Sequence, residues 1–268
     1  MMDVANNLAD DISLPPGLAL RPEPLSAPLD TGRVAAELAR IGLTLDERVA
    51  PRQFAGGLAN LNFLVRLSDS WAVLRRPPDG PLPPGANDMA REHRVLSALW
   101  QALPLAPRSL HLCTDTDVIG VPFQLLEFRT GLTIRGDALD PLPNTPETGK
   151  ALSAMLVETL AQVHAIDPVA VGLGTLGRPE GFFQRQIKGW LGRAGDILGS
   201  DLSPSARAVG DWLMACPAPD DSHPALLHSD FKLDNLLLDP DTLRATTLVD
   251  WDMGTRGSAM FDLATMLS

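Results

Sequence analysis

The chain has 268 residues, which is enough to bury a sizeable core in one large or two small domains. Its 22 basic and 33 acidic residues give a formal charge of −11, which argues against a nucleic-acid-binding surface, because such a surface needs clustered lysine and arginine. The start of the chain does not have the pattern of a secretory signal, and no apolar run approaches the roughly 18 residues that span a bilayer, so we expect a cytoplasmic protein with no nucleic-acid or membrane partner.

The first half of the chain predicts an antiparallel sheet with one helix packed near its strands. Residues 1–29 are rich in proline and predict a flexible leader. Glycine, serine and aspartate breakers separate the apolar runs that follow, as in a meander of short strands. The expected elements are a short helix at 31–41, strands at 52–55, 62–67 and 71–75, a helix at 86–102, and strands at 109–113 and 118–128, with a turn at 114–117.

The second half is mainly helical and contains one short hairpin. Apolar stripes predict helices at 150–166, 179–198 and 203–215. Two apolar runs, 236–238 and 247–249, flank the turn residues Asp239, Pro240 and Asp241 and predict a buried hairpin. Cys113 and Cys216 have no metal-ligand spacing and suggest no disulfide framework.

The most informative segment lies directly before this hairpin. Residues 228–235 read His-Ser-Asp-Phe-Lys-Leu-Asp-Asn, and Asp250 follows the second strand of the hairpin. Asp230 and Asn235 have the spacing of a kinase catalytic loop, in which an aspartate accepts the acceptor's proton and an asparagine holds Mg²⁺. An Asp- and Asn-rich stretch between apolar runs is often only a turn. The returning strand that ends in Asp250 favours the catalytic interpretation.

Phosphoryl transfer requires neutralised phosphates, a fixed metal ion and an aligned nucleophile. Asp230 is the candidate base or hydroxyl-orienting group, and Asn235 and Asp250 are candidate Mg²⁺ ligands, because hard oxygen donors suit a hard cation. Lys232 is a candidate contact to the γ-phosphate, and the alternative is a solvated surface lysine.

His228 and Asp252 are expected to support this loop. For His228 we expect a hydrogen bond that fixes the loop, with a catalytic role as the minority alternative. Asp252 either assists the metal or holds backbone amides.

The first half supplies candidates for nucleotide binding. Gly56 and Gly57 lie between two strands, where backbone can approach phosphates closely, although most such pairs are ordinary hairpin turns. Arg75 ends a strand at the place of a kinase's phosphate-binding lysine. Glu92 is the only charge on the apolar face of the next helix, so we expect it to pair with Arg75, the alternative being a place at the edge of that face in water. Backbone groups at Glu127 and Phe128 are expected to bind the adenine edge.

Between Arg52 and Leu267 the chain resembles the superfamily of aminoglycoside phosphotransferases and choline kinases, which are protein-kinase-like small-molecule kinases. The resemblance rests on the segments 56–62, 73–78 and 91–96, and most specifically on 228–235, 248–252 and 261–264. Asn60, in the first of these segments, is a further candidate for nucleotide binding. Within 73–78 and 91–96, the segments 75–78 and 91–94 look more like the branch found beside or fused to acyl-CoA dehydrogenases than like the drug-resistance enzymes. The resemblance implies that Asp262 supports the backbone of the catalytic loop. A hydroxylated acyl compound is an acceptor that it suggests.

We therefore expect an α+β, protein-kinase-like, two-lobed fold: a nucleotide-binding lobe at 30–128 with a five-stranded antiparallel sheet and one helix, and a mainly helical catalytic lobe with a β-hairpin at 129–268. Family members usually continue beyond the point matching Ser268 with helices that build the acceptor pocket, so the second lobe looks truncated. Arg75 also departs from the usual lysine.

The expected function is an ATP- and Mg²⁺-dependent phosphotransferase acting on a small-molecule hydroxyl: a hydroxyacyl compound, an aminoglycoside-like compound or an amino alcohol. GTP is not excluded as the donor. The alternative is a pseudokinase-like nucleotide-binding or interaction module without turnover. A hydrolase that uses aspartate pairs is disfavoured, because no nucleophile with an adjacent base is evident. The sequence leaves the oligomeric state open.

Overall fold

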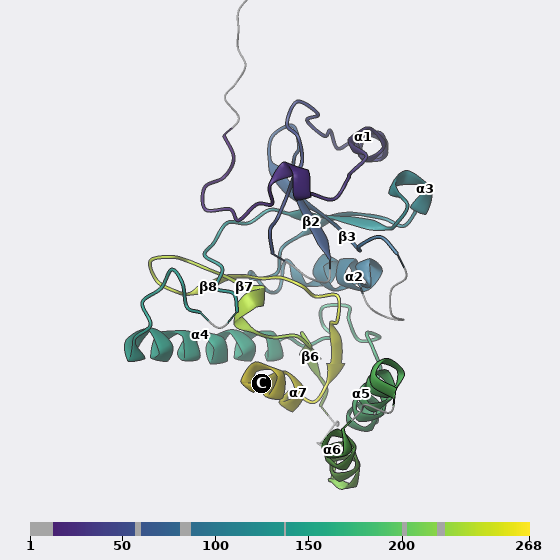
Figure 1. The fold of residues 1–268 in the computed structure, drawn as a ribbon, viewed down its shortest axis with the longest axis vertical. Helices are drawn as coiled ribbons and strands as arrows, with labels where there is room; N and C mark the ends of the chain where they lie inside the picture. The colour runs from purple at the N-terminus through teal and green to yellow at the C-terminus, as the bar shows by residue number, and fades with distance from the viewer. Residues whose placement is uncertain (1–12, 57–59, 81–86, 137, 200–202, 219–222) are drawn as a thin grey trace, which may run out of the picture. The chain divides into compact units, whose positions relative to one another are not determined.

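The computed structural model describes residues 13–56, 60–80, 87–136, 138–199, 203–218 and 223–268. The chain forms two compact units, each made of two chain segments (Figure 1). Unit 1 consists of Met1–Leu82 and Ser109–Thr130, and unit 2 consists of Pro83–Arg108 and Gly131–Ser268. The two units are described separately below.

Unit 1 contains the predicted five-stranded antiparallel sheet, with strand order β1-β2-β3-β5-β4. The side chains that point to its covered face, among them Phe63, Leu74 and Phe123, form one apolar core with Val34 and Leu38 of the first helix. The bounds are β1 (Arg52–Gln53), β2 (Leu61–Arg66), β3 (Trp71–Arg76), β4 (Ser109–Cys113), β5 (Phe123–Glu127) and helix α1 (Thr31–Arg40).

One segment of unit 1 differs from the prediction, which placed a turn at 114–117 and a strand from Val118 onward. The chain instead forms a short helix, α3 (Thr116–Ile119), before β5 begins at Phe123. The side chain of Asp115 accepts a hydrogen bond from the backbone N–H of Asp117, and Gly120 ends the helix with a left-handed φ of 85°. Both are standard helix-end signals, so local capping outweighed the strand tendency of valine and isoleucine.

The described part of the predicted leader, residues 13–29, runs beside the sheet. Its 3-10 helix η1 spans Glu23–Leu25. The backbone N–H of Arg21 donates to the carbonyl of Gln53 at 2.8 Å, and the backbone N–H of Ala27 donates to the Gln53 side chain at 2.7 Å. These bonds tie residues 21–27 to β1, whereas residues 1–12 lie outside the described part of the chain.

Unit 2 begins with α2 (Met89–Leu99), which the sequence analysis placed in the first lobe; the predicted lobe boundaries stay a prediction. The Asp88 side chain caps this helix by accepting from Arg91 N, and Glu92 lies among its buried residues. The predicted helices follow as α4 (Pro146–His164), α5 (Phe182–Leu198) and α6 (Pro204–Ala215), and α7 (Met260–Leu267) comes after the hairpin. In the part of the chain that the structure describes, no helix combines the length and the apolar character that a bilayer crossing requires.

Two short sheets position the candidate site of unit 2. The predicted hairpin is present as β7 (Leu236–Leu238) and β8 (Ala245–Leu248), with Leu236 opposite Leu248. A second antiparallel pair, β6 (Ala225–Leu227) and β9 (Thr255–Gly257), was not predicted. Strand β6 leads into residues 228–235, and β9 follows residues 249–252, so the two sheets frame both loops.

Candidate active site

The segment for which the sequence predicts a catalytic role, residues 228–235 and called the catalytic loop below, connects β6 to β7 and ends in the 3-10 helix η3 (Leu233–Asn235). The buried carboxylate of Asp262, on α7, accepts backbone hydrogen bonds from His228 at 2.8 Å and from Ser229 at 2.7 Å. Ser229, which directly precedes Asp230, has a left-handed φ of 69°. His164, the last residue of α4, places its Nε2 3.1 Å from Asp262 Oδ2. No feature of the sequence pointed to His164.

His228 joins the catalytic loop to the segment after β8, residues 249–252, which we call the metal loop. Its Nε2 lies 2.9 Å from the carbonyl oxygen of Val249, and its Nδ1 lies 3.3 Å from the backbone nitrogen of Asp230. A carbonyl only accepts and a backbone N–H only donates, so the tautomer with its proton on Nε2 satisfies both contacts. Burial lowers the pKa of His228, although the neighbouring Asp262 acts in the opposite direction, and this favours the neutral ring. The ring packs edge-on against Trp251 and Phe231.

The carboxylate of Asp230 lies between two polar side chains of its own loop. Lys232 Nζ donates to it at 2.9 Å, and Asn235 Nδ2 donates to its Oδ2 at 2.9 Å and to its backbone carbonyl at 2.8 Å. The Lys232 side chain is 47% exposed, so this ion pair orients more than it stabilises. The amide nitrogen of Asn235 is occupied by both bonds to Asp230. Its amide oxygen is therefore the atom left to serve as a ligand.

The metal loop follows β8 without a break. The backbone N–H of Val249 donates to the carbonyl of Asn235 at 2.9 Å, so Val249 is bonded to both ends of the catalytic loop. Asp250 has a left-handed φ of 71° and a partly buried side chain, and Asp252 is buried. Carboxylate and amide oxygens are the donors that Mg²⁺ prefers, so Asn235 and Asp250 offer the right chemistry for this ion.

Glu92 of α2 belongs to the support of the metal loop. Its Oε1 accepts a hydrogen bond from the backbone N–H of Trp251 at 3.1 Å, and the Glu92 side chain is 1% exposed. The sequence predicts a pairing of Glu92 with Arg75 or a place in water at the edge of the apolar face. It does not indicate the contact with Trp251, because nothing in the pattern of α2 points to a residue about 160 positions away along the chain. Arg75 lies in unit 1 on β3, and its pairing with Glu92 stays a prediction.

The other predicted nucleotide-binding residues lie in unit 1. Gly56 follows β1 and Asn60 is buried directly before β2, whereas Gly57 lies outside the described residues. Glu127 ends β5 and forms an ion pair of 3.0 Å with Arg129, and Phe128 follows the strand. Their roles in binding a nucleotide stay predictions.

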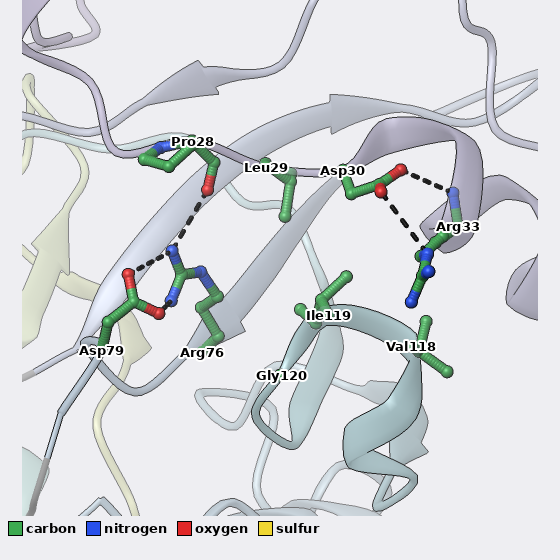
Figure 2. A pocket seen from close by; sticks show the side chains of 9 residues that line it. All are labelled: Pro28, Leu29, Asp30, Arg33, Arg76, Asp79, Val118, Ile119 and Gly120. Atoms are coloured by element: carbon green, nitrogen blue, oxygen red, sulfur yellow. Dashed lines mark hydrogen bonds and ion pairs between the residues drawn. The ribbon is translucent and has the colours of Figure 1, made fainter.

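A cavity in unit 1 contains none of the predicted site residues. Figure 2 shows it beside the buried guanidinium of Arg76, which donates to both carboxylate oxygens of Asp79 at 2.8 and 3.3 Å. Arg76 also donates to the backbone carbonyls of Pro28 and Pro77, each at 3.1 Å. These bonds fasten two loop segments to β3, which indicates a structural role for Arg76.

A comparison with known protein families decides the identity of the fold. The sequence profile of the family described as "Phosphotransferase enzyme family" matches residues 51–268. The chain belongs to this family. The match includes the catalytic loop, the metal loop and the sheet of unit 1, and the fold is therefore α+β and protein-kinase-like, as predicted.

The curated relatives of this family member are larger proteins. Acyl-CoA dehydrogenase family member 11 from Gallus gallus is 34% identical over 216 residues, which cover 80% of this chain and 27% of the relative. Acyl-CoA dehydrogenase family member 10 from Mus musculus is 31% identical over 212 residues, covering 79% of this chain and 20% of the relative. The chain thus spans about a quarter of the length of the curated relatives it matches.

Solved structures of phosphotransferases share the fold. A Ralstonia eutropha JMP134 protein, provisionally described as an aminoglycoside phosphotransferase, superimposes with a TM-score of 0.70 at 27% identity, covering 88% of this chain and 69% of that one. The aminoglycoside phosphotransferase APH(4)-Ia, in a ternary complex with ADP and hygromycin B, gives a TM-score of 0.56 at 16% identity, covering 86% and 74%. At that identity the second likeness concerns the fold alone.

Proposed function

We propose that this phosphotransferase family member transfers the γ-phosphate of ATP, with Mg²⁺, to a hydroxyl group of a small molecule. One observation carries the proposal: the Asp230 carboxylate is held 2.9 Å from both Lys232 Nζ and Asn235 Nδ2, in a loop anchored by the buried Asp262. A carboxylate fixed in this way can accept a proton from a hydroxyl without first being reoriented.

The protein's own groups would act mainly by positioning the acceptor hydroxyl, the transferred phosphoryl group and the metal ion. Asp230 orients the acceptor hydroxyl and takes its proton, and Lys232, whose ammonium group already touches Asp230, is placed to contact the transferred phosphoryl group. Asn235, through its amide oxygen, and Asp250 would hold the metal ion. When bound, Mg²⁺ supplies positive charge that neutralises the phosphate oxygens. His228, Asp252 and Asp262 would keep the two loops in place.

We assign nucleotide binding to the loop before β2, to β3 with α2, and to the end of β5. The residues concerned are Gly56, Gly57, Asn60, Arg75, Glu92, Glu127 and Phe128. The ADP in the complex of APH(4)-Ia supports ATP as the donor, and GTP is the alternative. For the acceptor, the names of the curated relatives favour a hydroxylated acyl compound, and hygromycin B in the same complex favours an aminoglycoside-like compound. Amino alcohols are the third class of acceptor that we propose to test.

The test is a transfer assay with labelled ATP and Mg²⁺ over these three acceptor classes, using the whole chain. With the best acceptor, Asp230→Asn should lower the turnover by about 10²–10⁴-fold while nucleotide affinity stays close to that of the wild type. Asp250→Ala should remove the Mg²⁺-dependent gain in nucleotide affinity measured by calorimetry. Asp241→Asn, the same chemical change at an exposed position in the turn of the neighbouring hairpin, is the matched control and should leave both quantities unchanged.

Two results would count against the proposal. Turnover of Asp230→Asn close to that of the wild type would remove Asp230 from the mechanism. Metal-dependent nucleotide binding without transfer to any acceptor of the three classes would select the pseudokinase alternative.

A further inference from the structure

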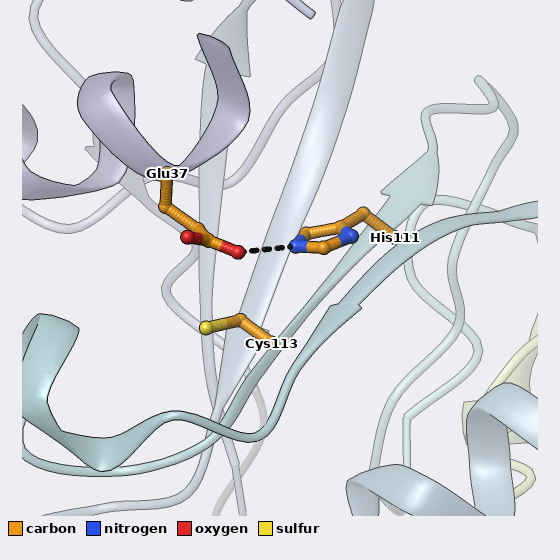
Figure 3. A group of neighbouring side chains, drawn as sticks. All are labelled: Glu37, His111 and Cys113. Carbon is orange, nitrogen blue, oxygen red and sulfur yellow. Dashed lines mark hydrogen bonds and ion pairs between the residues drawn. The ribbon is translucent and has the colours of Figure 1, made fainter. Parts of the chain in front are cut away.

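Three potential metal ligands meet in unit 1, and none of them belongs to the candidate active site. Glu37 lies on α1, and His111 and Cys113 lie on the edge strand β4 (Figure 3). Residues two apart on a strand point to the same face, so His111 and Cys113 both face α1. One carboxylate oxygen, one imidazole nitrogen and the thiol sulfur lie within 4.8 Å of one another.

We propose that Glu37, His111 and Cys113 bind a divalent transition-metal ion, with Zn²⁺ as the best match, and that the bound ion fastens α1 to β4. A mixed oxygen, nitrogen and sulfur donor set suits Zn²⁺, which accepts all three kinds of ligand, whereas Mg²⁺ and Ca²⁺ prefer oxygen alone. Three protein ligands leave a fourth tetrahedral position for water.

The distances fit this ion after a small movement of one side chain. In a tetrahedral site with metal–ligand bonds of about 2.0 Å, neighbouring nitrogen and oxygen ligands lie about 3.3 Å apart. His111 Nε2 and Glu37 Oε1 are separated by 3.3 Å. A sulfur at about 2.3 Å from the ion needs to lie about 3.5 Å from the other ligands. Cys113 Sγ is within 4.8 Å of them, so a shift of about 1 Å, within reach of side-chain adjustment, completes the site.

Neighbouring side chains already orient two of the three ligands. Arg40 Nη1 contacts Glu37 Oε2 at 3.1 Å, which leaves Oε1 as the oxygen facing His111. The His111 ring stands edge-on to Phe123, with ring centroids 6.2 Å apart, and this contact restricts the rotation of the imidazole. A hydrogen bond to a ligating carboxylate, such as the one from Arg40 to Glu37, is a regular part of metal sites.

The balance of charge also favours a divalent cation. A thiolate, a carboxylate and a neutral imidazole carry two negative charges, which a divalent ion cancels, so the assembly suits a mostly buried position. Metal binding requires the thiolate, so a bound cation would displace the proton of the Cys113 thiol. The alternative is a simple His111–Glu37 ion pair beside an unreactive cysteine.

Cobalt substitution distinguishes the two interpretations. The whole chain, stripped of metal with a chelator, is titrated with Co²⁺ and followed by absorption. A metal-bound thiolate gives a charge-transfer band in the near ultraviolet, and we expect it to saturate at one equivalent and to disappear when Zn²⁺ is added. Cys113→Ser should abolish the band. Cys216→Ser removes the other cysteine, which lies in unit 2, and should leave the titration unchanged.

If Cys113→Ser does not fold because Cys113 is buried, Glu37→Gln and His111→Gln are the alternative variants for testing the site. Each should weaken Zn²⁺ binding by more than the roughly 10- to 100-fold cost of losing a hydrogen-bond partner of a ligand. Zn²⁺ should also raise the melting temperature of the wild type and of Cys216→Ser, but not that of the ligand variants. Absence of the cobalt band in the wild type would overturn the proposal. So would an equal band in Cys113→Ser, or loss of binding in Cys216→Ser.

Discussion

The catalytic loop and the metal loop are each held by a buried carboxylate on a helix, but they depend on it to different degrees. Asp262 accepts two consecutive backbone N–H groups of the catalytic loop and also contacts His164. Glu92 accepts one, the N–H of Trp251 in the metal loop. Both loops also have bonds of their own, such as Asn235 Nδ2 to Asp230 O and Trp251 Nε1 to Leu248 O. Because Asp262 satisfies two backbone N–H groups and Glu92 satisfies one, we expect the catalytic loop to depend more on its carboxylate.

Removal of Asp262 should have the largest effect on stability. Asp262→Ala strands two buried backbone N–H groups, and we expect a loss of about 3–5 kcal/mol in the free energy of unfolding. Asp262→Asn keeps one acceptor oxygen and should lose about half as much. Urea denaturation of the three proteins measures both values. A loss below about 0.5 kcal/mol for the alanine variant, the range of ordinary surface substitutions, would contradict the role of Asp262.

Removal of Glu92 should have a smaller effect. Glu92→Ala leaves one buried N–H, that of Trp251, without its acceptor, which costs about 1–3 kcal/mol. Glu92→Gln retains an oxygen that can accept this bond, and it is the matched control. The same denaturation series ranks the variants. If Glu92→Ala destabilises the protein as much as Asp262→Ala, the two loops depend equally on their carboxylates and the contrast fails.

The smallest expected effect is a gain in stability at Ser229. Its left-handed φ of 69° strains any residue with a Cβ, and its buried hydroxyl has no hydrogen-bond partner among the described residues. Ser229→Gly should therefore stabilise the protein by about 1 kcal/mol. Ser229→Ala removes the hydroxyl but keeps the Cβ, so the difference between the two variants isolates the backbone strain. Equal stabilities for glycine and alanine would show that the strain is negligible.

Local patterns predicted much of the fold. The sheet of unit 1, the long helices and the β7–β8 hairpin follow from alternating or helical apolar spacing, which a single segment contains in full. The pair β6–β9 has only three residues in each strand, and the strands pair across about 30 intervening residues, so neither segment carries a periodic signal. Helix α3 was missed although its ends, Asp115 and Gly120, are recognisable capping residues.

For the candidate site, too, the sequence predicted local motifs but not contacts between residues far apart in the chain. The spacing of Asp230, Asn235 and Asp250 is a local motif and could be recognised directly. The contacts of Glu92 with Trp251, of His164 with Asp262, and of Glu37 with His111 join residues 159, 98 and 74 positions apart. Such contacts arise from tertiary packing. The spacing of Cys113 and Cys216 gave no hint of the cluster in unit 1, because two of its three ligand groups are not cysteines.

Val249 has a consequence for how this part of the chain can vary. Its N–H is donated to Asn235 and its carbonyl accepts from His228, so both of its connections use backbone atoms only. Every amino acid except proline carries these two groups. Leucine, isoleucine or threonine at this position can preserve both bonds. A mutational scan that ranks positions by how many substitutions they accept would therefore not detect the role of Val249. Proline alone would remove one of the two bonds, the one donated to Asn235, while its carbonyl could still accept from His228, which makes it the informative replacement at this position.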